Sequence, residues 1–435
     1  MIRFEYWKNK QMIVMVIMLF VFQSGTTWSD TASSSDVKAY TGERLKLITD
    51  IESSYTYSDL KHADSLSGGI LDCLLAASWK MKEDQFLILK YDGGYEKKLD
   101  FYSDGNVPRQ RTEYQEHTLT PMLRMGIGHD DNLSLIPSLF YTATFNKDTQ
   151  STGWNDGLYN YYDAGAGIDL EFGNAGFGRG SGLLTIGLQY YNRHYPNFIS
   201  LLDLAVENED LGLISALDTE KDEKDYKGLL AKIEYLWASD TRFSWNTEYS
   251  ILYKKLDDKK VVDLNGSLTG DGQVDHLHTL SFQFTYKLTR ELQTGLKLGT
   301  DINKSNQNFW DGMESYSYVD DVATENYYDY FSYGIRPEIS YLFQPFPLSV
   351  SIFYSFHKTK YDHRKANFYG GVYKNEKQWE VKKTIFADIA YMISEKWSIH
   401  ANWENTRSES NNDDDRFYLY DYTLNIYSTG LSFKY

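Results

Sequence analysis

The 435-residue chain has one cysteine, one unbroken apolar run and a deficit of basic residues, and each shortage excludes a class of protein. Cys73 stands alone, so no intramolecular disulfide can form. The apolar run covers residues 12–22, which is too short to cross a bilayer as a helix. With a mean hydropathy of -0.52, the chain is not a bundle of transmembrane helices.

The acidic balance of the chain points away from nucleic acid. Lysine and arginine total 44 against 61 aspartate and glutamate residues, which gives a formal net charge of -17. A surface of this sign repels a polyanion. We therefore expect no nucleic-acid partner.

The first 29 residues have the order of a secretory signal peptide. Arg3, Lys8 and Lys10 give a positive start, the apolar run follows, and small and polar residues come next. This order directs export and predicts a mature chain that begins near Asp30.

Aromatic residues and strict alternation are what the chain has in abundance. Aromatics make up 16% of it and tyrosine occurs 37 times, which is typical of proteins that place Tyr and Trp at membrane interfaces. Along residues 242–253 apolar side chains alternate with polar ones, as in a strand whose two faces meet different environments. Sixteen segments share this pattern: 44–57, 69–81, 85–102, 113–126, 132–146, 158–173, 182–194, 225–237, 241–254, 274–288, 291–302, 327–343, 348–361, 378–393, 397–408 and 416–435.

The connections between these segments alternate between short and long. The short ones carry turn chemistry, as at 238–240, 344–347 and 394–396, and the long ones are rich in Asp, Glu, Asn and Gly. A membrane barrel has this arrangement, because its short turns face the periplasm and its long loops face outward.

These observations predict an all-β fold, a transmembrane antiparallel up-and-down β-barrel with 16 strands. The first two strands have the least regular alternation. If residues 44–81 instead form a periplasmic or plug segment, the barrel has 14 strands. The predicted organisation is a signal peptide at 1–29, a short periplasmic segment at 30–43 and the barrel at 44–435.

The last eight residues resemble the C-terminal assembly signal of bacterial outer-membrane barrels. This signal has a polar residue, a glycine, an aromatic residue and a terminal aromatic residue at fixed positions. In this chain these are Ser428, Gly430, Phe433 and Tyr435, in that order. The terminal residue is Tyr, where Phe is more usual in these proteins. The resemblance implies the outer membrane of a Gram-negative-type bacterium and recognition by the barrel-insertion machinery.

Charged residues on the polar strand faces should line the interior of the barrel. Both signs are mixed, so the sequence does not indicate whether cations or anions are preferred. A barrel of sixteen strands is normally wide enough for an aqueous channel, which favours an open pore over charges that fill the lumen by pairing across it. The pore-lining candidates are Arg124, Asp169, Glu171, Lys232, Glu234, Arg242, Glu248, Lys287, Lys297, Asp301, Arg336, Glu338, Asp388, His400 and Glu404.

Several other features admit both a functional and a structural interpretation. The loop at 195–224 either folds inward and narrows the pore or stays outside. The acidic stretches at 129–132 and 413–415 could offer oxygen ligands to a divalent cation, but no known ligand spacing is present, so we expect solvated residues and no metal site. His276 and His278 share a strand face without further zinc ligands, which favours a structural placement.

Tyrosine-rich segments and histidines complete the candidates. Tyrosines at 159–162 and 327–330 could stack against sugars, although a role in the interfacial girdle is expected. No histidine stands in a motif with a nucleophile, and the chain has neither G-x-S-x-G nor H-E-x-x-H, so we expect no enzyme.

The sequence thus predicts a porin-like outer-membrane channel for polar solutes, with saccharides as one candidate class. The alternatives are a plugged barrel for surface binding or assembly, and an enzyme with its site at the barrel rim. Expected partners are outer-membrane lipid, the barrel-assembly machinery through the C-terminal strand, and a polar solute. No cofactor is implied.

Overall fold

The computed structural model describes most of the predicted barrel. The described residues are 45–60, 66–100, 111–128, 132–147, 153–175, 180–198, 223–239, 242–311, 322–368, 373–413 and 421–435. The predicted signal peptide and the predicted segment at 30–43 lie outside them. Within these ranges, no helix has the length and apolar character needed to cross a membrane.

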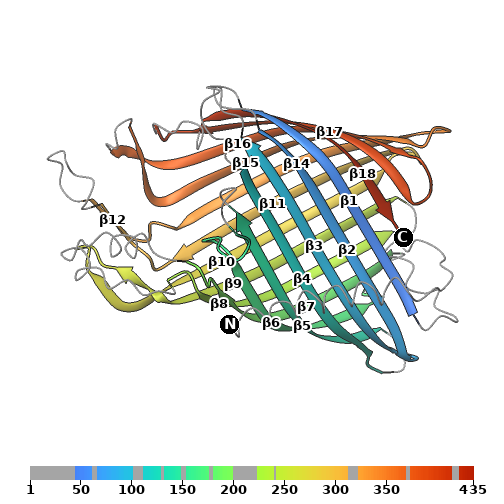
Figure 1. Cartoon of the computed structure of the whole chain (residues 1–435), viewed down its shortest axis with the longest axis horizontal. Coiled ribbons are helices and arrows are strands. Elements are labelled where there is room, and N and C mark those ends of the chain that lie inside the picture. Colours follow the sequence, from blue (N-terminus) through green and yellow to red (C-terminus); the bar gives the residue numbers. More distant parts are fainter. Residues whose placement is uncertain are drawn as a thin grey trace. The chain divides into compact units, whose positions relative to one another are not determined.

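Sixteen strands form one closed antiparallel barrel, which confirms the predicted fold class (Figure 1). The ring closes where β1 pairs with β18, from Asp50 opposite Lys434 to Leu60 opposite Leu424. The strands are β1 (Leu45–Leu60), β2 (Leu66–Lys82), β3 (Gln85–Asp100), β4 (Arg111–Gly126), β5 (Leu133–Lys147), β6 (Tyr161–Gly173), β7 (Gly180–His194), β8 (Tyr226–Ser239), β9 (Phe243–Val262), β10 (Leu268–Lys287), β11 (Leu292–Ser305), β14 (Tyr330–Phe343), β15 (Leu348–Asn367), β16 (Tyr373–Met392), β17 (Trp397–Ser410) and β18 (Tyr422–Lys434).

The first two strands are regular members of the ring, so the 14-stranded alternative is wrong. β1 pairs with β2 from Leu45 opposite Trp79 to Ser58 opposite Leu66 without a register shift. The physical reason is the continuous ladder on both sides of these strands. β1 pairs with β18 and β2 pairs with β3, so the backbone groups of β1 and β2 are satisfied inside the wall and neither strand is left over as a plug.

Side-chain exposure shows which face of the wall is concave. Along β14, Ile335 and Ile339 are 42% and 47% exposed, whereas Ser332 on the other face is 2% exposed. Side chains crowd together on the concave side of a closed sheet and spread apart on the convex side. The apolar face therefore points outward and the polar face inward, which inverts the arrangement of a soluble protein.

Two hairpins extend well beyond their predicted ends. β9 and β10 cover most of the predicted loop at 255–273, and β15 and β16 cover most of that at 362–377. The Lys-rich and Asp-rich composition of these segments is typical of loops, but a paired hairpin in water tolerates the same residues. The β9–β10 turn is held by Asp263, whose Oδ1 accepts the backbone N–H groups of Asn265 and Ser267, each at 2.8 Å.

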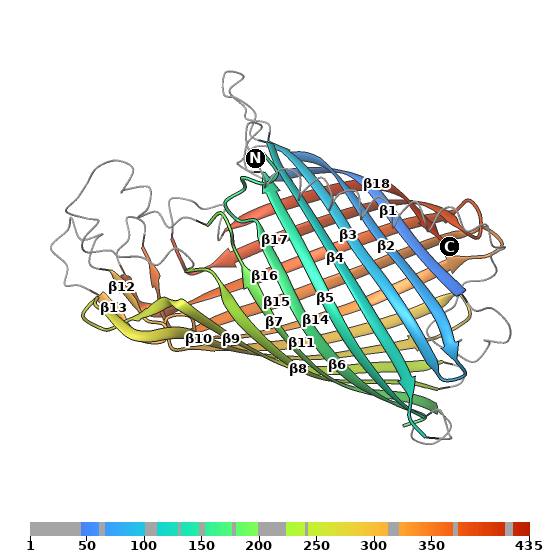
Figure 2. The ribbon, with the colours of Figure 1, turned by 60° about the horizontal axis from the view of Figure 1, so that its bottom comes forward.

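A small hairpin between β11 and β14 escaped the sequence analysis. Its strands, β12 (Phe309–Asp311) and β13 (Val322–Thr324), are too short to carry a visible alternation. Figure 2 shows them beside the far ends of β9 and β10. Gln307, just before β12, accepts from the backbone N–H of Val262 at 2.9 Å and donates to the carbonyl of Lys260 at 3.1 Å. These two hydrogen bonds attach the segment before β12 to the end of strand β9.

Closure of the ring can be tested by a disulfide across the β1–β18 seam. Thr56 lies opposite Ser428, with both side chains inward, whereas the adjacent Thr429 points outward. In a Cys73→Ser background, Thr56→Cys with Ser428→Cys should form a disulfide under mild oxidation, because directly opposed Cβ atoms lie about 5 Å apart. Thr56→Cys with Thr429→Cys should form little. Peptide mapping of the folded barrel without reductant gives the readout, and absence of the first cross-link would contradict closure.

Candidate functional site: the inward face of the barrel

The inward face of the wall carries the pore-lining candidates that lie on strands. Strand register alternates each of them with an outward apolar position. They are Arg124 on β4, Asp169 and Glu171 on β6, Lys232 and Glu234 on β8, Glu248 on β9, Lys287 on β10, Lys297 and Asp301 on β11, Arg336 and Glu338 on β14, Asp388 on β16, and His400 and Glu404 on β17. Arg242 lies in the turn before β9.

Several of these charges pair along the wall with near neighbours. Arg124 Nη2 lies 2.9 Å from Glu171 Oε2, across the intervening strand β5. Lys232 Nζ lies 3.2 Å from Glu234 Oε2 on the same strand. All these side chains keep part of their surface exposed, and an ion pair in such a setting contributes roughly 0–1 kcal/mol. The pairs organise the surface but contribute little to barrel stability.

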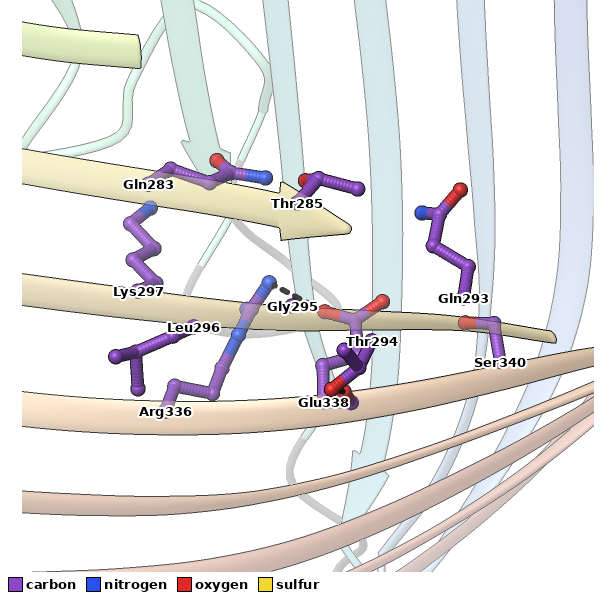
Figure 3. Close-up of a pocket in the computed structure, with 10 residues that line it drawn as sticks. All are labelled: Gln283, Thr285, Gln293, Thr294, Gly295, Leu296, Lys297, Arg336, Glu338 and Ser340. Carbon is purple, nitrogen blue, oxygen red and sulfur yellow. Dashed lines mark hydrogen bonds and ion pairs between the residues drawn. The ribbon is translucent and has the colours of Figure 1, made fainter. Parts of the chain in front are cut away.

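A polar cluster on β10, β11 and β14 encloses a cavity of roughly 40 Å³. Figure 3 shows its side chains together on one stretch of wall, with Arg336 and Glu338 joined by an ion pair of 3.3 Å. The Arg336 guanidinium carbon also lies 4.6 Å from the centroid of the Phe353 ring. A cavity of this size holds water but no larger solute. Its lining residues are Gln283, Thr285, Gln293, Thr294, Gly295, Leu296, Lys297, Arg336, Glu338 and Ser340.

The sequence analysis missed an acidic surface on the first four strands. Asp50, Glu52, Asp72, Asp92 and Glu116 line one hollow of roughly 450 Å³, and we call these five residues the acidic wall. The polar face of β1 was visible in the sequence. It was not assigned to the lumen because the apolar faces of β1 and β2 were irregular.

Cations balance the acidic wall only in part. Lys90 Nζ lies 2.8 Å from Asp92 Oδ2, and Lys434 Nζ lies 3.1 Å from Asp50 Oδ2. His400 Nε2 lies 3.3 Å from Glu52 Oε1 without the alignment of a hydrogen bond. Among the described residues, these two lysines and one histidine face five carboxylates, so carboxylates outnumber cations on this part of the inward face.

Arg193, which the sequence analysis did not identify, lies between tyrosine rings and faces inward at the loop end of β6, β7 and β8. Arg193 donates from Nε and Nη2 to the two oxygens of Asp163, each at 2.7 Å. Its guanidinium carbon lies 3.8 Å from the ring centroid of Tyr161 and 5.3 Å from that of Tyr226. Bidentate pairing together with ring stacking fixes the orientation of this cation.

The tyrosine-rich segment at 159–162 divides between the two faces. Tyr161 belongs to the inward arginine cluster, whereas Tyr162 points outward and lies 6.2 Å from Tyr141, ring centroid to ring centroid. The composition of the segment could not separate the two roles, because the faces follow from strand register alone.

The histidines on strand β10 point outward beside aromatic rings. The Tyr249 hydroxyl lies 2.9 Å from His278 Nδ1, and the His276 ring lies 5.1 Å from that of Tyr253. At the loop end of β7, His194 Nδ1 lies 2.5 Å from Asp225 Oδ2, but its side chain is 55% exposed. The Asp225 carboxylate also accepts the backbone N–H of Tyr195 at 2.7 Å, so it stabilises the turn there.

Some candidate segments lie wholly or partly outside the described residues. These are positions 199–222 of the loop at 195–224, positions 129–131 of one acidic stretch, and positions 414 and 415 of the other. The expectations on them stay predictions.

The C-terminal signature has a packing role at the seam of the barrel. A Cβ atom at Gly430 would clash with the imidazole of His400 and with the carbonyl oxygen of Ser53. Phe433 points outward, and its ring centroid lies 4.8 Å from that of Trp397. Glycine at position 430 therefore lets β17, β18 and β1 approach with His400 in place.

Comparisons with known proteins give likeness in fold only. No protein-family profile and no curated protein matches the chain. Among solved structures, OmpT, an outer membrane protein of Vibrio cholerae, has a TM-score of 0.43 at 9% identity, over 90% of this chain and 100% of that one. OprB of Pseudomonas putida has a TM-score of 0.43 at 8% identity, over 90% and 92%. The siderophore receptor PirA from Acinetobacter baumannii has 0.44 at 9%, over 90% and 80%.

The architecture itself defines the class of protein. The wall is closed, its outward face is apolar and its inward face is polar. Closed barrels with inverted faces are the β-structures that a bilayer permits. The chain is a β-barrel of the bacterial outer membrane.

The packing at Gly430 yields a stability prediction with a matched control. Gly430→Ala should lower the free energy of unfolding by about 1–3 kcal/mol, because the added methyl group meets His400 and the Ser53 carbonyl. Gly299→Ala on β11, also inward, meets nothing within 4 Å and should change it by less than about 0.5 kcal/mol. Urea unfolding of the refolded barrels measures both, and equal effects would refute the packing role.

Proposed function

We propose that the barrel is an open outer-membrane channel for polar solutes. The observation that carries the proposal is the pairing of the inward charges along the wall, as in Arg124–Glu171, Lys232–Glu234 and Arg336–Glu338. Charges that filled the lumen would pair across it instead. The surface they form is hydrated and offers hydroxyl, amide and ionic groups to a passing solute.

The size of the ring supports the same proposal. Sixteen strands spaced about 4.8 Å apart and tilted by about 40° give a wall circumference of roughly 100 Å. The radius is then about 16 Å, and side chains several ångström long leave an aqueous opening at the centre. Small polar solutes, saccharides included, fit an opening of this size.

The acidic wall and the fixed arginine suggest how solutes are sorted. Incompletely balanced carboxylates on one side of a wet lumen attract cations. At the loop end, Arg193 and the rings of Tyr161 and Tyr226 combine a fixed cation with flat apolar faces. Such a surface can contact both the polar and the C–H faces of a saccharide.

A rim enzyme is the less favoured candidate. The His194–Asp225 contact resembles the acid–base part of a catalytic constellation, but the imidazole is more than half exposed and Asp225 is shared with the backbone of Tyr195. In nucleophilic catalysis the histidine hydrogen-bonds to the nucleophile, and the described part of the chain places none beside His194. We infer a transport role for the barrel, without catalysis.

Single-channel recording in a planar bilayer tests the proposal directly. The refolded mature chain should give steady nanosiemens-scale openings, because a hydrated lumen of this radius conducts as a column of electrolyte. The absence of channel currents, from protein shown by circular dichroism and heat-modifiability to be folded, would refute the channel function. It would leave a plugged barrel for surface binding or assembly.

Charge removal from the acidic wall tests the sorting mechanism. Glu52→Gln with Asp72→Asn should lower the cation-over-anion permeability ratio about two- to fivefold, because two unit charges in a wet lumen contribute up to ~1 kcal/mol. Glu291→Gln with Glu395→Gln removes the same charge from the turns and should leave the ratio close to that of the wild type. Reversal potentials in a salt gradient give the readout, and equal shifts in the two variants would refute the role of the acidic wall.

A further inference from the structure

The outward face of the barrel differs sharply between its two ends. At the turn end it carries aromatic side chains, such as Trp397 packed against Phe433, and Trp237 packed against Phe243. At the loop end, outward positions carry cations, among them Lys97, Lys147, and Lys227 and Lys255, which share the carboxylate of Asp257. The two interfaces of the membrane therefore meet surfaces of different chemistry.

Four outward cations lie on the neighbouring strands β15, β16 and β17. Lys358 and Lys360 share the outward face of β15 with Tyr354, and Lys383 and Arg407 lie directly opposite each other on β16 and β17. Glu409 is the carboxylate among them. We call Lys358, Lys360, Lys383, Arg407 and Glu409 the basic patch, which has four cations and one anion in a chain whose formal net charge is -17.

The height of the basic patch follows from strand geometry. Arg407 is ten residues beyond Trp397 on β17. At about 3.3 Å per residue and a tilt of about 40°, this separation spans about 25 Å along the membrane normal. The apolar band of an outer-membrane barrel has the same height. With Trp397 at the lower interface, Arg407 therefore lies at the headgroup level of the outer leaflet.

Between the apolar band and the basic patch, the outward side chains become steadily more polar, as expected for positions that approach the membrane surface. On β17 the outward residues pass from Trp403 to Asn405 and then to Arg407. The Asn405 side chain donates to Asn425 Oδ1 on the neighbouring strand at 2.8 Å. An apolar ring, a paired amide and a cation thus follow one another within about 10 Å of height.

Glu409 holds two of the cations in a fixed arrangement. Its Oε1 lies 2.9 Å from Arg407 Nε and its Oε2 lies 3.1 Å from Lys383 Nζ. This geometry uses the Nε edge of the guanidinium and leaves the terminal nitrogens of Arg407, whose side chain is 65% exposed, for another acceptor. A guanidinium and an ammonium held side by side suit phosphate oxygens.

We propose that the basic patch binds the phosphate groups of a phosphorylated glycolipid of the outer leaflet, of the lipid A class. The patch lies on the convex, lipid-facing side at headgroup height, its charge is opposite to that of the phosphates, and its two central cations are preorganised. Because each cation is attracted to the anionic headgroup, its removal should weaken lipid binding several-fold. The proposal does not depend on whether the lumen conducts.

The test measures binding of bisphosphorylated lipid A to the detergent-solubilised mature barrel by native mass spectrometry. Lys383→Gln with Arg407→Gln should weaken the tightest binding about 10- to 30-fold. Lys383→Arg with Arg407→Lys keeps both charges and should stay within about threefold of wild type. Lys80→Gln with Lys82→Gln, at the turn end of β2, removes equal charge and should have no effect.

Lipid A without phosphates should bind wild type and the Gln variant alike. Equal binding of lipid A by wild type and the Gln variant, both folded by heat-modifiability, would overturn the proposal. So would full competition by inorganic phosphate, which would identify a free anion as the ligand. A change in oligomeric state in the Gln variant, with lipid binding unaltered, would also overturn it. That result would show that the basic patch contacts a second copy of the chain.

Discussion

Inside the hydrocarbon layer no water bonds to a backbone N–H or C=O group, so each strand there needs a partner on both sides. In this chain the requirement is met at the seam, where β1 and β18 pair from Asp50–Lys434 to Leu60–Leu424. Closure then determines the other features. It separates a convex from a concave face, and it places the β1 start and the β18 end at the same end of an even, antiparallel ring. The close approach at Gly430 lets the seam strands meet with His400 in place.

Closure also decides what the inward charges can contribute. Because the concave face is wet, the side chains of pairs such as Lys232–Glu234 and Arg336–Glu338 stay 22–36% exposed and add little to stability. Arg193–Asp163 differs, because the Asp163 side chain is 9% exposed, the pair is bidentate and tyrosine rings flank the guanidinium. Removing one partner there would leave a poorly solvated charge. Most inward charges can therefore be replaced at little cost in stability, whereas this pair also stabilises the fold.

Much of the fold can be predicted from the sequence, because a strand between lipid and water needs strict alternation. Residues 330–343 show this, with every outward apolar residue already visible as one face. The ends of β9, β10, β15 and β16 could not be predicted, since residues such as Asp257 and Lys365 suit a water-exposed hairpin as well as a loop. Within the site, the alternation assigns Asp301 and Glu338 to the inward face. It cannot tell that Arg193 meets Asp163, or that Glu52 and Asp72 share a hollow, because those contacts depend on the register between strands.

One strand carries two independent patterns, and β17 shows both. Its even positions, Ser398, His400, Asn402 and Glu404, face the lumen, where solute and neighbouring side chains act on them. Its odd positions pass from Trp397 through Trp403 and Asn405 to Arg407, in the order of the layers of a membrane. Because the backbone separates the two sets, a change on the lipid face leaves the luminal contacts intact, and the converse also holds. Lipid affinity and solute preference can therefore change separately in the same strand, as long as the backbone ladder that closes the ring is kept.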